Sequence, residues 1–333
     1  MELLLFDRPK FDRLYNCSGY DVDQIPLEVR RNRIVGVVYV GGWAIFTPLY
    51  MLCLWAMWSQ LKQKQATAYC IMFTLGCIHL MGQQMSGLVA GLFAFNGVVF
   101  CSCPILNYVT SSFALGSWVT STLLSLILGF NRCLVLYDRS LNDRVFGGFR
   151  LVFWLAVPLV YGAYVMVFTP AIVYNSIIMA YVFNPHLGYR DDPTGVYHST
   201  PNRIHNSVIF CTEIILYVNL IRSYNKMAST SESKTKLKYE RQVYIPVLLI
   251  GAMHFMCGFV YFLLDTISVP PIVGLIGTTA YWLSQGLPAV VYLIFNQTIR
   301  ATAMRRLRLK SGTVSSTAYT VQASNSTAPP THN

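Results

Sequence analysis

The chain has 333 residues, of which 54% are hydrophobic and 12% charged, and it carries a formal net charge of +11. The charges cluster between long apolar runs, which favours a single polytopic membrane domain and argues against two soluble domains. A basic balance also occurs in nucleic-acid-binding proteins, but here the Lys and Arg residues lie in short stretches beside apolar runs, where they act as topology signals, so no nucleic-acid partner is expected.

The first segment, residues 1–33, is predicted to be an extracellular N-terminal segment. Its apolar start, Leu3 to Phe6, is followed at once by Asp7, which makes it too short for a signal-peptide core. The first spanning helix is therefore expected to direct insertion. Asn16 begins a glycosylation sequon, and sequons of the same form begin at Asn296 and Asn325.

Residues 34–297 contain repeated apolar runs of a length that crosses a lipid bilayer, about 20 residues each. They predict an all-α membrane protein with a seven-transmembrane helix bundle. The seven predicted spans are 34–58, 68–92, 104–131, 151–174, 205–224, 243–264 and 271–295.

The third span is predicted to be the central helix of the bundle. Trp118, Thr122, Ser125, Gly129 and Arg132 follow one another at steps of four, three, four and three. On a helix they form one polar stripe on an otherwise apolar surface, which must face the protein interior. A guanidinium is costly at the bilayer centre, so the Arg is expected where the helix leaves the membrane.

The basic residues of the connections fall mostly on one side of the seven spans, which predicts a multi-pass plasma-membrane protein with its N-terminus outside. Arg30, Arg31 and Arg33 would then be extracellular, and they are the main argument for the inverted topology. The connections of the other, outer side hold only Arg190 and Arg203. The basic set is Lys62, Lys64, Arg132, Arg139, Arg144, Arg150, Lys226, Lys234, Lys236, Lys238, Arg241 and, in the tail, Arg300, Arg305, Arg306, Arg308 and Lys310.

Four connecting or terminal stretches have distinct compositions. The long outer stretch 175–204 is rich in Tyr, Asn, Pro and His, and a loop of this length is often functional or a lid. Residues 225–242 form a basic third inner loop. Residues 298–310 are expected to form an amphipathic juxtamembrane helix on the inner leaflet, and 311–333 a disordered cytoplasmic tail.

Candidate ligand-pocket residues are polar or aromatic groups inside the spans. Glu213 is the strongest, because a carboxylate at membrane depth is costly and needs a partner; a protonated Glu bonded across helices is the equal alternative. The other candidates share helix faces that also fit ordinary core packing. They are Trp118 in span three, His254 and Tyr261 in span six, and Trp282 and Gln285 in span seven.

Several chemistries lack the residues that they need. No Lys occurs between Arg241 and Lys310, so a retinal Schiff base in span seven is excluded. No His and Cys spacing is typical of zinc, and no paired acids or phosphate-binding Gly-rich loop is present. The chain is therefore predicted not to be an enzyme and to hold no cofactor and no metal.

Five motifs along the chain, in this order, resemble the nematode serpentine chemoreceptors of class T. The similarity covers about residues 15 to 310, and the motifs are specific as a set. They are Tyr15-Asn16-Cys17-Ser18, Phe100-Cys101 with Pro104, Asn131-Arg132-Cys133, Tyr181-Val182-Phe183-Asn184-Pro185, and Gly286, Pro288, Tyr292, Asn296 with Thr298-Ile299-Arg300.

The resemblance implies a rhodopsin-like G-protein-coupled receptor architecture within the lipid bilayer. It implies a heterotrimeric G protein and a small external molecule as partners, with location in a sensory cilium as a family trait. Arg132 is implied in the switch and the G-protein contact, and Asn131, Tyr217, Pro288 and Tyr292 are assigned to the same function. His79 stands where the wider rhodopsin-like pattern has an acid that binds sodium, so no sodium site is expected.

Three of the nine Cys, Cys17, Cys101 and Cys103, fall on the predicted outer side, where disulfides persist. Rhodopsin-like receptors usually bridge span three to the second outer loop, but no Cys occurs between Cys133 and Cys211. The hypothesis is a Cys17–Cys101 bridge, with Cys17–Cys103 or free thiols as the alternatives.

The function expected from these observations is a chemosensory G-protein-coupled receptor that detects a small external molecule. The alternative is a seven-span ligand-gated channel subunit of inverted topology, similar to insect odorant receptors. A glycan on Asn16 favours the receptor, whereas a glycan on Asn325 favours the channel.

Overall fold

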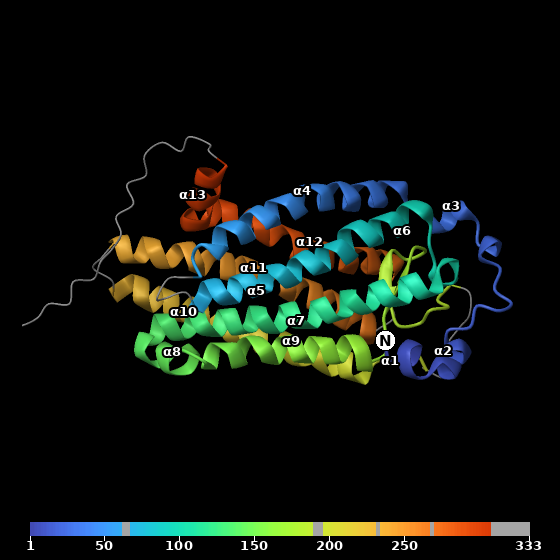
Figure 1. Ribbon diagram of the computed structural model, residues 1–333, viewed down its shortest axis with the longest axis horizontal. Helices are drawn as coiled ribbons and strands as arrows, with labels where there is room; N and C mark the ends of the chain where they lie inside the picture. Colours follow the sequence, from blue (N-terminus) through green and yellow to red (C-terminus); the bar gives the residue numbers. More distant parts are fainter. Residues whose placement is uncertain (62–66, 189–195, 231–233, 267–269, 308–333) are drawn as a thin grey trace, which may run out of the picture.

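The computed structural model describes residues 1–61, 67–188, 196–230, 234–266 and 270–307, and its long helices lie side by side along one axis (Figure 1). One of them is interrupted by a π-helical turn, η2, which joins α5 to α6. The long elements are α4 (Arg33–Trp58), α5 (Thr67–Gln83), η2 (Gln84–Val89), α6 (Ala90–Asn96), α7 (Pro104–Tyr137), α9 (Arg150–Phe168), α10 (Thr200–Thr230), α11 (Lys234–Thr266) and α12 (Pro271–Phe295).

Short elements gather at the two ends of the long helices (Figure 1). The end that carries the N-terminal segment, here the cap end, has α1 (Glu2–Phe6), α2 (Arg8–Leu14), η1 (Val22–Gln24), α3 (Leu27–Arg30), η3 (Phe100–Ser102) and the strands β1 (Val173–Asn175) and β2 (Ala180–Val182). The strands pair antiparallel, with Tyr174 opposite Tyr181. The opposite end, here the far end, has α8 (Arg139–Phe146) and α13 (Gln297–Arg306).

Helix α7 is the central helix, as its polar stripe predicts. In an apolar 18-residue part of α7, 72% of the residues are buried, against 17% in the corresponding parts of Leu27–Trp58 and Arg150–Phe168. It packs against α5, α9, α10 and α11. The helix continues past the predicted end at residue 131 to Tyr137, where Asp138 begins the next helix by accepting a hydrogen bond from the backbone N–H of Ser140 at 2.8 Å.

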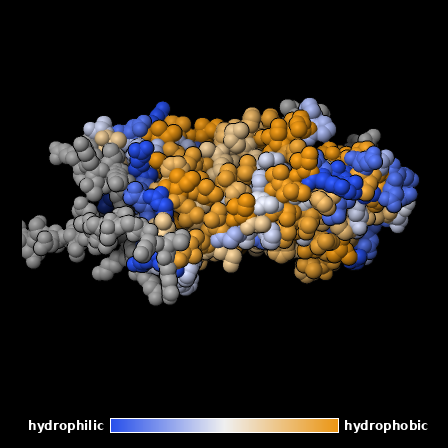
Figure 2. All heavy atoms as spheres, turned by 90° about the horizontal axis from the view of Figure 1, so that it is seen from above, coloured by the Kyte–Doolittle hydropathy of each residue, from blue (hydrophilic) through white to orange (hydrophobic). Residues whose placement is uncertain are grey.

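Five helices in the described part of the chain are long and apolar enough to cross a membrane. They cover Leu27–Trp58, Pro104–Tyr137, Arg150–Phe168, Thr200–Ser229 and Arg241–Leu264. Figure 2 shows the corresponding surface, with hydrophobic residues around the middle of the molecule and hydrophilic residues at both ends. The two other predicted spans, 68–92 and 271–295, coincide with the helical segments α5 to α6 and α12. Helix α12 buries Thr278, Ser284 and Gln285 inside the protein.

Two predicted boundaries are wrong. Span four does not reach residue 174, because α9 ends at Phe168 and Pro170 follows, which has no backbone N–H to continue a helix. The inner loop predicted for 225–242 is largely helical, because α10 continues to Thr230 and α11 begins at Lys234. Its charged residues are good helix formers, so these helices extend beyond their apolar parts.

The predicted juxtamembrane helix 298–310 overlaps α13, which covers Gln297–Arg306. The side chain of Asn296 caps this helix by accepting a hydrogen bond from the N–H of Ile299 at 3.0 Å. Residues 308–310 and the predicted tail 311–333 lie outside the described residues.

Candidate functional site

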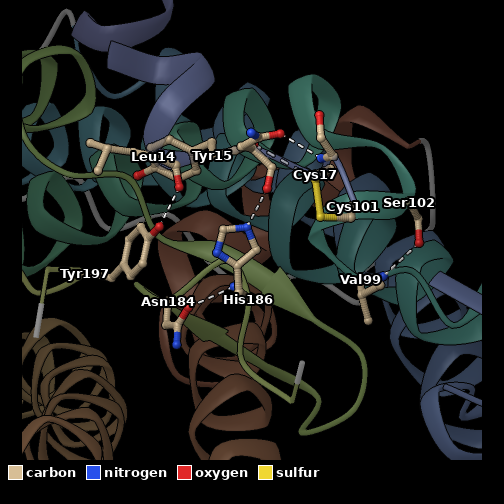
Figure 3. Close-up of a disulfide and its surroundings, with 11 residues drawn as sticks. Leu14, Tyr15, Cys17, Val99, Cys101, Ser102, Asn184, His186 and Tyr197 are labelled. Carbon is tan, nitrogen blue, oxygen red and sulfur yellow. Dashed lines mark hydrogen bonds between the residues drawn. A yellow bond between two sulfur atoms is a disulfide. The ribbon is translucent and has the colours of Figure 1, made fainter. Parts of the chain in front are cut away.

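The N-terminal segment is attached to the cap end by a disulfide and an aromatic cluster. Cys17 and Cys101 are joined, with their Cα atoms 5.6 Å apart (Figure 3). The ring of Phe11 lies 5.0 Å from that of Tyr108 on α7, and the ring of Tyr15 lies 4.9 Å from it. Burial raises the pKa of Tyr15 well above its usual range, so its phenol is neutral at physiological pH.

The same segment contacts the stretch that follows β2. His186 Nε2 lies 3.0 Å from the carbonyl oxygen of Asn16, and Tyr197 donates a hydrogen bond to the carbonyl oxygen of Leu14 (Figure 3). The His186 ring also stacks on Tyr20, with centroids 5.2 Å apart. The N-terminal segment therefore contacts this stretch at His186 and at Tyr197.

Arg30 connects α3 to the turn after α6. Its side chain is only 8% exposed and donates hydrogen bonds to the carbonyl oxygen of Gly97 at 3.2 Å and to Asp23 at 2.8 Å. These contacts give this Arg a structural role, which is independent of the membrane-orientation signal that the sequence pattern suggested.

A cavity of about 790 Å³ lies at the cap end, between α7, α10, α11, α12 and the strand region. Its volume is within the range of small-molecule pockets, roughly 300–1,000 Å³. The hairpin approaches α12 closely at Gly274, where an added Cβ would lie 2.9 Å from the Cβ of Ala180. A larger residue at this position would push β2 away from the bundle and open the wall of the cavity.

The deep wall of the cavity is aromatic and has fixed polar partners. Trp118 donates from Nε1 to the amide oxygen of Asn206 at 3.2 Å, and its ring meets Tyr281 edge-on at 5.9 Å. The Tyr281 hydroxyl in turn donates to the carbonyl oxygen of Ala114 at 3.0 Å and pairs with Ser117 at 2.8 Å. These bonds hold the two rings in place from α7, α10 and α12.

A chain of polar side chains continues from Trp118 into the bundle. The His254 ring meets Trp118 edge-on at 5.9 Å, and its Nε2 lies 3.3 Å from Nε2 of His79. His79 Nδ1 lies 2.7 Å from the hydroxyl of Tyr50 on α4. The Nδ1 atom of His254 is buried without a hydrogen-bond partner among the described residues. The chain links α7, α11, α5 and α4.

The structure brings together only part of the predicted pocket. Trp118 and Tyr261 line the cavity, and the His254 ring contacts Trp118 edge-on without itself lining the cavity. Glu213, Trp282 and Gln285 are not among the lining residues. The six candidates therefore do not form one site.

The three residues outside the cavity are buried elsewhere. Trp282 stacks on Tyr39 of α4, with ring centroids 5.0 Å apart. Gln285 lies against Gly82 of α5, and its Oε1 has no hydrogen-bond partner in the described part of the chain. Glu213 is 1% exposed, and one of its carboxylate oxygens likewise has no partner there.

The predicted switch residues occupy the half of the bundle toward the far end. Arg132 donates from Nε and an NH2 group to the amide oxygen of Asn131, at 3.1 and 2.6 Å. Asn131 then donates to the amide oxygen of Asn142 on α8 at 2.8 Å. A neutral amide oxygen therefore accepts both of these bonds from the guanidinium.

The other switch residues are on α10 and α12. The Tyr217 hydroxyl lies 3.3 Å from that of Ser125 on α7, and its ring contacts α11 at Gly251, which has no side chain in the way. Pro288 and Tyr292 are buried on α12, and the Tyr292 hydroxyl has no hydrogen-bond partner among the described residues.

Sequence reasoning missed the part of the cavity formed by the start of α10. Asn202, Arg203 and Asn206 line it there, and Tyr281 lines it from α12. The i, i+4 spacing of the two Asn residues was an available signal, because it puts both amides on one helix face. No signal distinguished Tyr281 from its neighbour Trp282. Within the described residues, no three His, Cys, Asp or Glu side chains gather to form a metal site.

Comparison with known proteins identifies relatives across almost the whole chain. The family described as "Serpentine type 7TM GPCR chemoreceptor Srt" has a sequence profile that matches residues 2–316. A Caenorhabditis elegans protein described as serpentine receptor class T-55 is 22% identical over 314 residues, which are 94% of this chain and 85% of that protein.

Proposed function

The chain belongs to the class T family of serpentine 7TM GPCR chemoreceptors, and from this premise we propose that it detects a small external molecule and signals to a heterotrimeric G protein. In this proposal all seven predicted helices span the plasma membrane, the cap end faces outward and the far end faces the cytoplasm. The chain would act in a sensory membrane such as that of a cilium.

The observation that carries the proposal is the position of the cavity relative to the Asn131–Arg132 cluster. The cavity lies at the cap end and the cluster lies near the far end of the same central helix. Trp118 lines the cavity 14 positions before Arg132. At 1.5 Å per residue this separation is about 21 Å, so one helix reaches from the proposed ligand to the proposed G-protein contact.

Signalling then requires that the ligand favour one arrangement of the helices over another. A ligand against Trp118 contacts a side chain that also touches α11 through His254 and α12 through Tyr281. A change in these contacts alters the relative stability of the helix arrangements, and a differential affinity for them shifts the population.

Replacing Arg132 by Ala tests the proposed coupling. The expected result is normal surface expression and loss of ligand-driven G-protein dissociation, because the variant lacks the guanidinium that Asn131 holds near the far end. The assay is G-protein dissociation in cells that express the receptor, screened against volatile and water-soluble compounds.

Arg222→Ala is the matched control, because Arg222 is an exposed cation on α10, toward the far end of the bundle. It removes the same charge and should leave signalling unchanged. Full signalling by the Arg132 variant would remove this residue from the mechanism, and equal loss in both variants would indicate a general charge effect.

A further inference from the structure

The rim and the interior of the cavity differ in charge and polarity, and this difference bears on the kind of molecule that fits. The interior is formed by aromatic and aliphatic side chains such as Trp118, Tyr281 and Leu115. The first turn of α10 contributes polar groups, namely Ser199, Asn202 and Arg203.

Arg203 is an exposed cation that lines the cavity and has no ion pair or side-chain hydrogen bond in the described structure. The ion pairs found among the described residues are Arg8 with Asp12 and Arg30 with Asp23. The described cavity lining contains no carboxylate. A cationic ligand would therefore meet repulsion from Arg203, and no carboxylate among the described lining residues compensates it.

The start of α10 adds to this positive potential. The N-terminus of a helix carries a partial positive charge, which favours an anion nearby. Pro201 has no N–H and the N–H of Asn202 donates to Ser199 Oγ at 3.3 Å, so the contribution here comes from the helix dipole and not from free N–H groups. Residues 199, 202, 203 and 206 of this helix start all line the cavity, so its positive end belongs to the cavity wall. The amide oxygen of Asn202, a residue only 9% exposed, has no partner in the described part of the chain. Because it is an acceptor, it would take a hydrogen-bond donor of the ligand, such as a hydroxyl group, and not the anionic group.

The distance between the charged rim and the aromatic floor suits a short molecule. Arg203 precedes Asn206 by three residues, or about 4.5 Å along the helix axis. Asn206 holds the indole of Trp118 directly. A ligand with its polar head at the guanidinium therefore places its apolar body against Trp118 and Tyr281.

We infer that the cavity takes a small, largely apolar organic acid, whose anionic group pairs with Arg203 at the start of α10 and whose apolar part lies against Trp118 and Tyr281. This inference rests on the proposed ligand-binding function of the cavity and adds the chemical class of the ligand. An anionic lipid headgroup offers the same charge, and the experiment separates the two sources.

The test measures equilibrium binding of three probes with one apolar body to the full-length receptor in discs of zwitterionic lipid. The probes are octanoate, octanol and octylammonium. Octanoate is expected to bind at least about tenfold more tightly than the other two, a ratio that corresponds to about 1.4 kcal/mol. Equal binding of the three probes, tighter binding of octylammonium, or no binding of octanoate to folded receptor would overturn the inference.

Variants locate the anion site. Arg203→Gln should weaken octanoate binding about tenfold, Arg203→Lys should keep most of it, and Arg222→Gln on the exposed surface of the same helix should leave it unchanged. Octanoate binding that does not respond to Arg203→Gln contradicts the assignment. Displacement of octanoate by phosphatidylglycerol in the discs would assign Arg203 to lipid and overturn it as well.

The outcome is independent of signalling. Because the assay contains no G protein, it measures ligand binding alone. A receptor that signals in response to neutral odorants but does not prefer octanoate would keep the proposed function and refute the organic-acid inference.

Discussion

Glu213 is a buried carboxylate that does not line the cavity. A carboxylate at membrane depth is costly, and the sequence left two equal interpretations, a ligand-pocket residue or a protonated Glu bonded across helices. The structure buries the residue to 1% exposure outside the cavity lining and leaves one oxygen without a partner among the described residues. The high cost of the charge therefore does not by itself identify a ligand contact.

Replacing Glu213 by Gln should keep or raise thermal stability and leave the ligand response unchanged, because the amide has the same shape without a carboxyl group to bury. The reverse change at a comparable buried site, Gln285→Glu, should lower stability, on the order of 2–3 kcal/mol for an acid at this depth. Both variants are measured by thermal unfolding in detergent and by the G-protein assay.

Loss of ligand response in a stable Glu213→Gln receptor would contradict this prediction and give the carboxyl group a role in signalling.

At the scale of elements, the packing of α7 against α9 depends on small residues. An added Cβ at Gly162 of α9 would collide with the side chain of Thr120, and its nearest backbone neighbour is the carbonyl oxygen of Gly116. Small residues allow helix backbones to approach closely, which is the usual basis of helix packing in membranes. The central helix and α9 are therefore held at a distance that only glycine permits.

Gly162→Ala should destabilise the receptor by about 1–3 kcal/mol, because the added methyl group has no space between α7 and α9. Gly41→Ala on α4 is the control, since an added Cβ there meets nothing within 4 Å. That change should be neutral or slightly stabilising, because Ala is the better helix former. Thermal unfolding of both variants checks the difference, and equal midpoints would refute the close-contact argument.

The elements also show what the sequence could predict. Long apolar runs identified the helices, and the polar stripe identified α7 as the central one, because both are local periodic signals. The three-residue strands β1 and β2 were not predicted, because they are too short for a periodic pattern. The cavity was predicted only in part, since Arg203 and Tyr281 line it through contacts between distant elements.

At the scale of the whole molecule, the membrane orientation decides which end of the helix bundle faces the outside and can carry a glycan. Asn16 is exposed at the cap end, and its side chain accepts a hydrogen bond from the N–H of Ser18 at 2.7 Å. Asn296, which begins another sequon, is buried between α12 and α13. Asn325 lies outside the described residues.

The proposed orientation predicts a glycan on Asn16. Treatment of the expressed receptor with a glycosidase should increase its electrophoretic mobility, and Asn16→Gln should abolish that change. Asn325→Gln is the control and should leave the mobility change intact. Loss of the glycan in the Asn325 variant, with Asn16→Gln unaffected, would reverse the orientation and favour the channel alternative.

The Cys17–Cys101 bond, which spans 84 positions, also constrains the order of biosynthesis. Its first cysteine precedes α4 and its second follows α6, so the ribosome has to complete both helical segments before the two thiols can meet. During translation the nascent amino-terminal segment stays untethered until that hairpin of helices has been made. Oxidative closure consequently cannot precede the synthesis of residue 101, and a chain truncated before that residue can never acquire it.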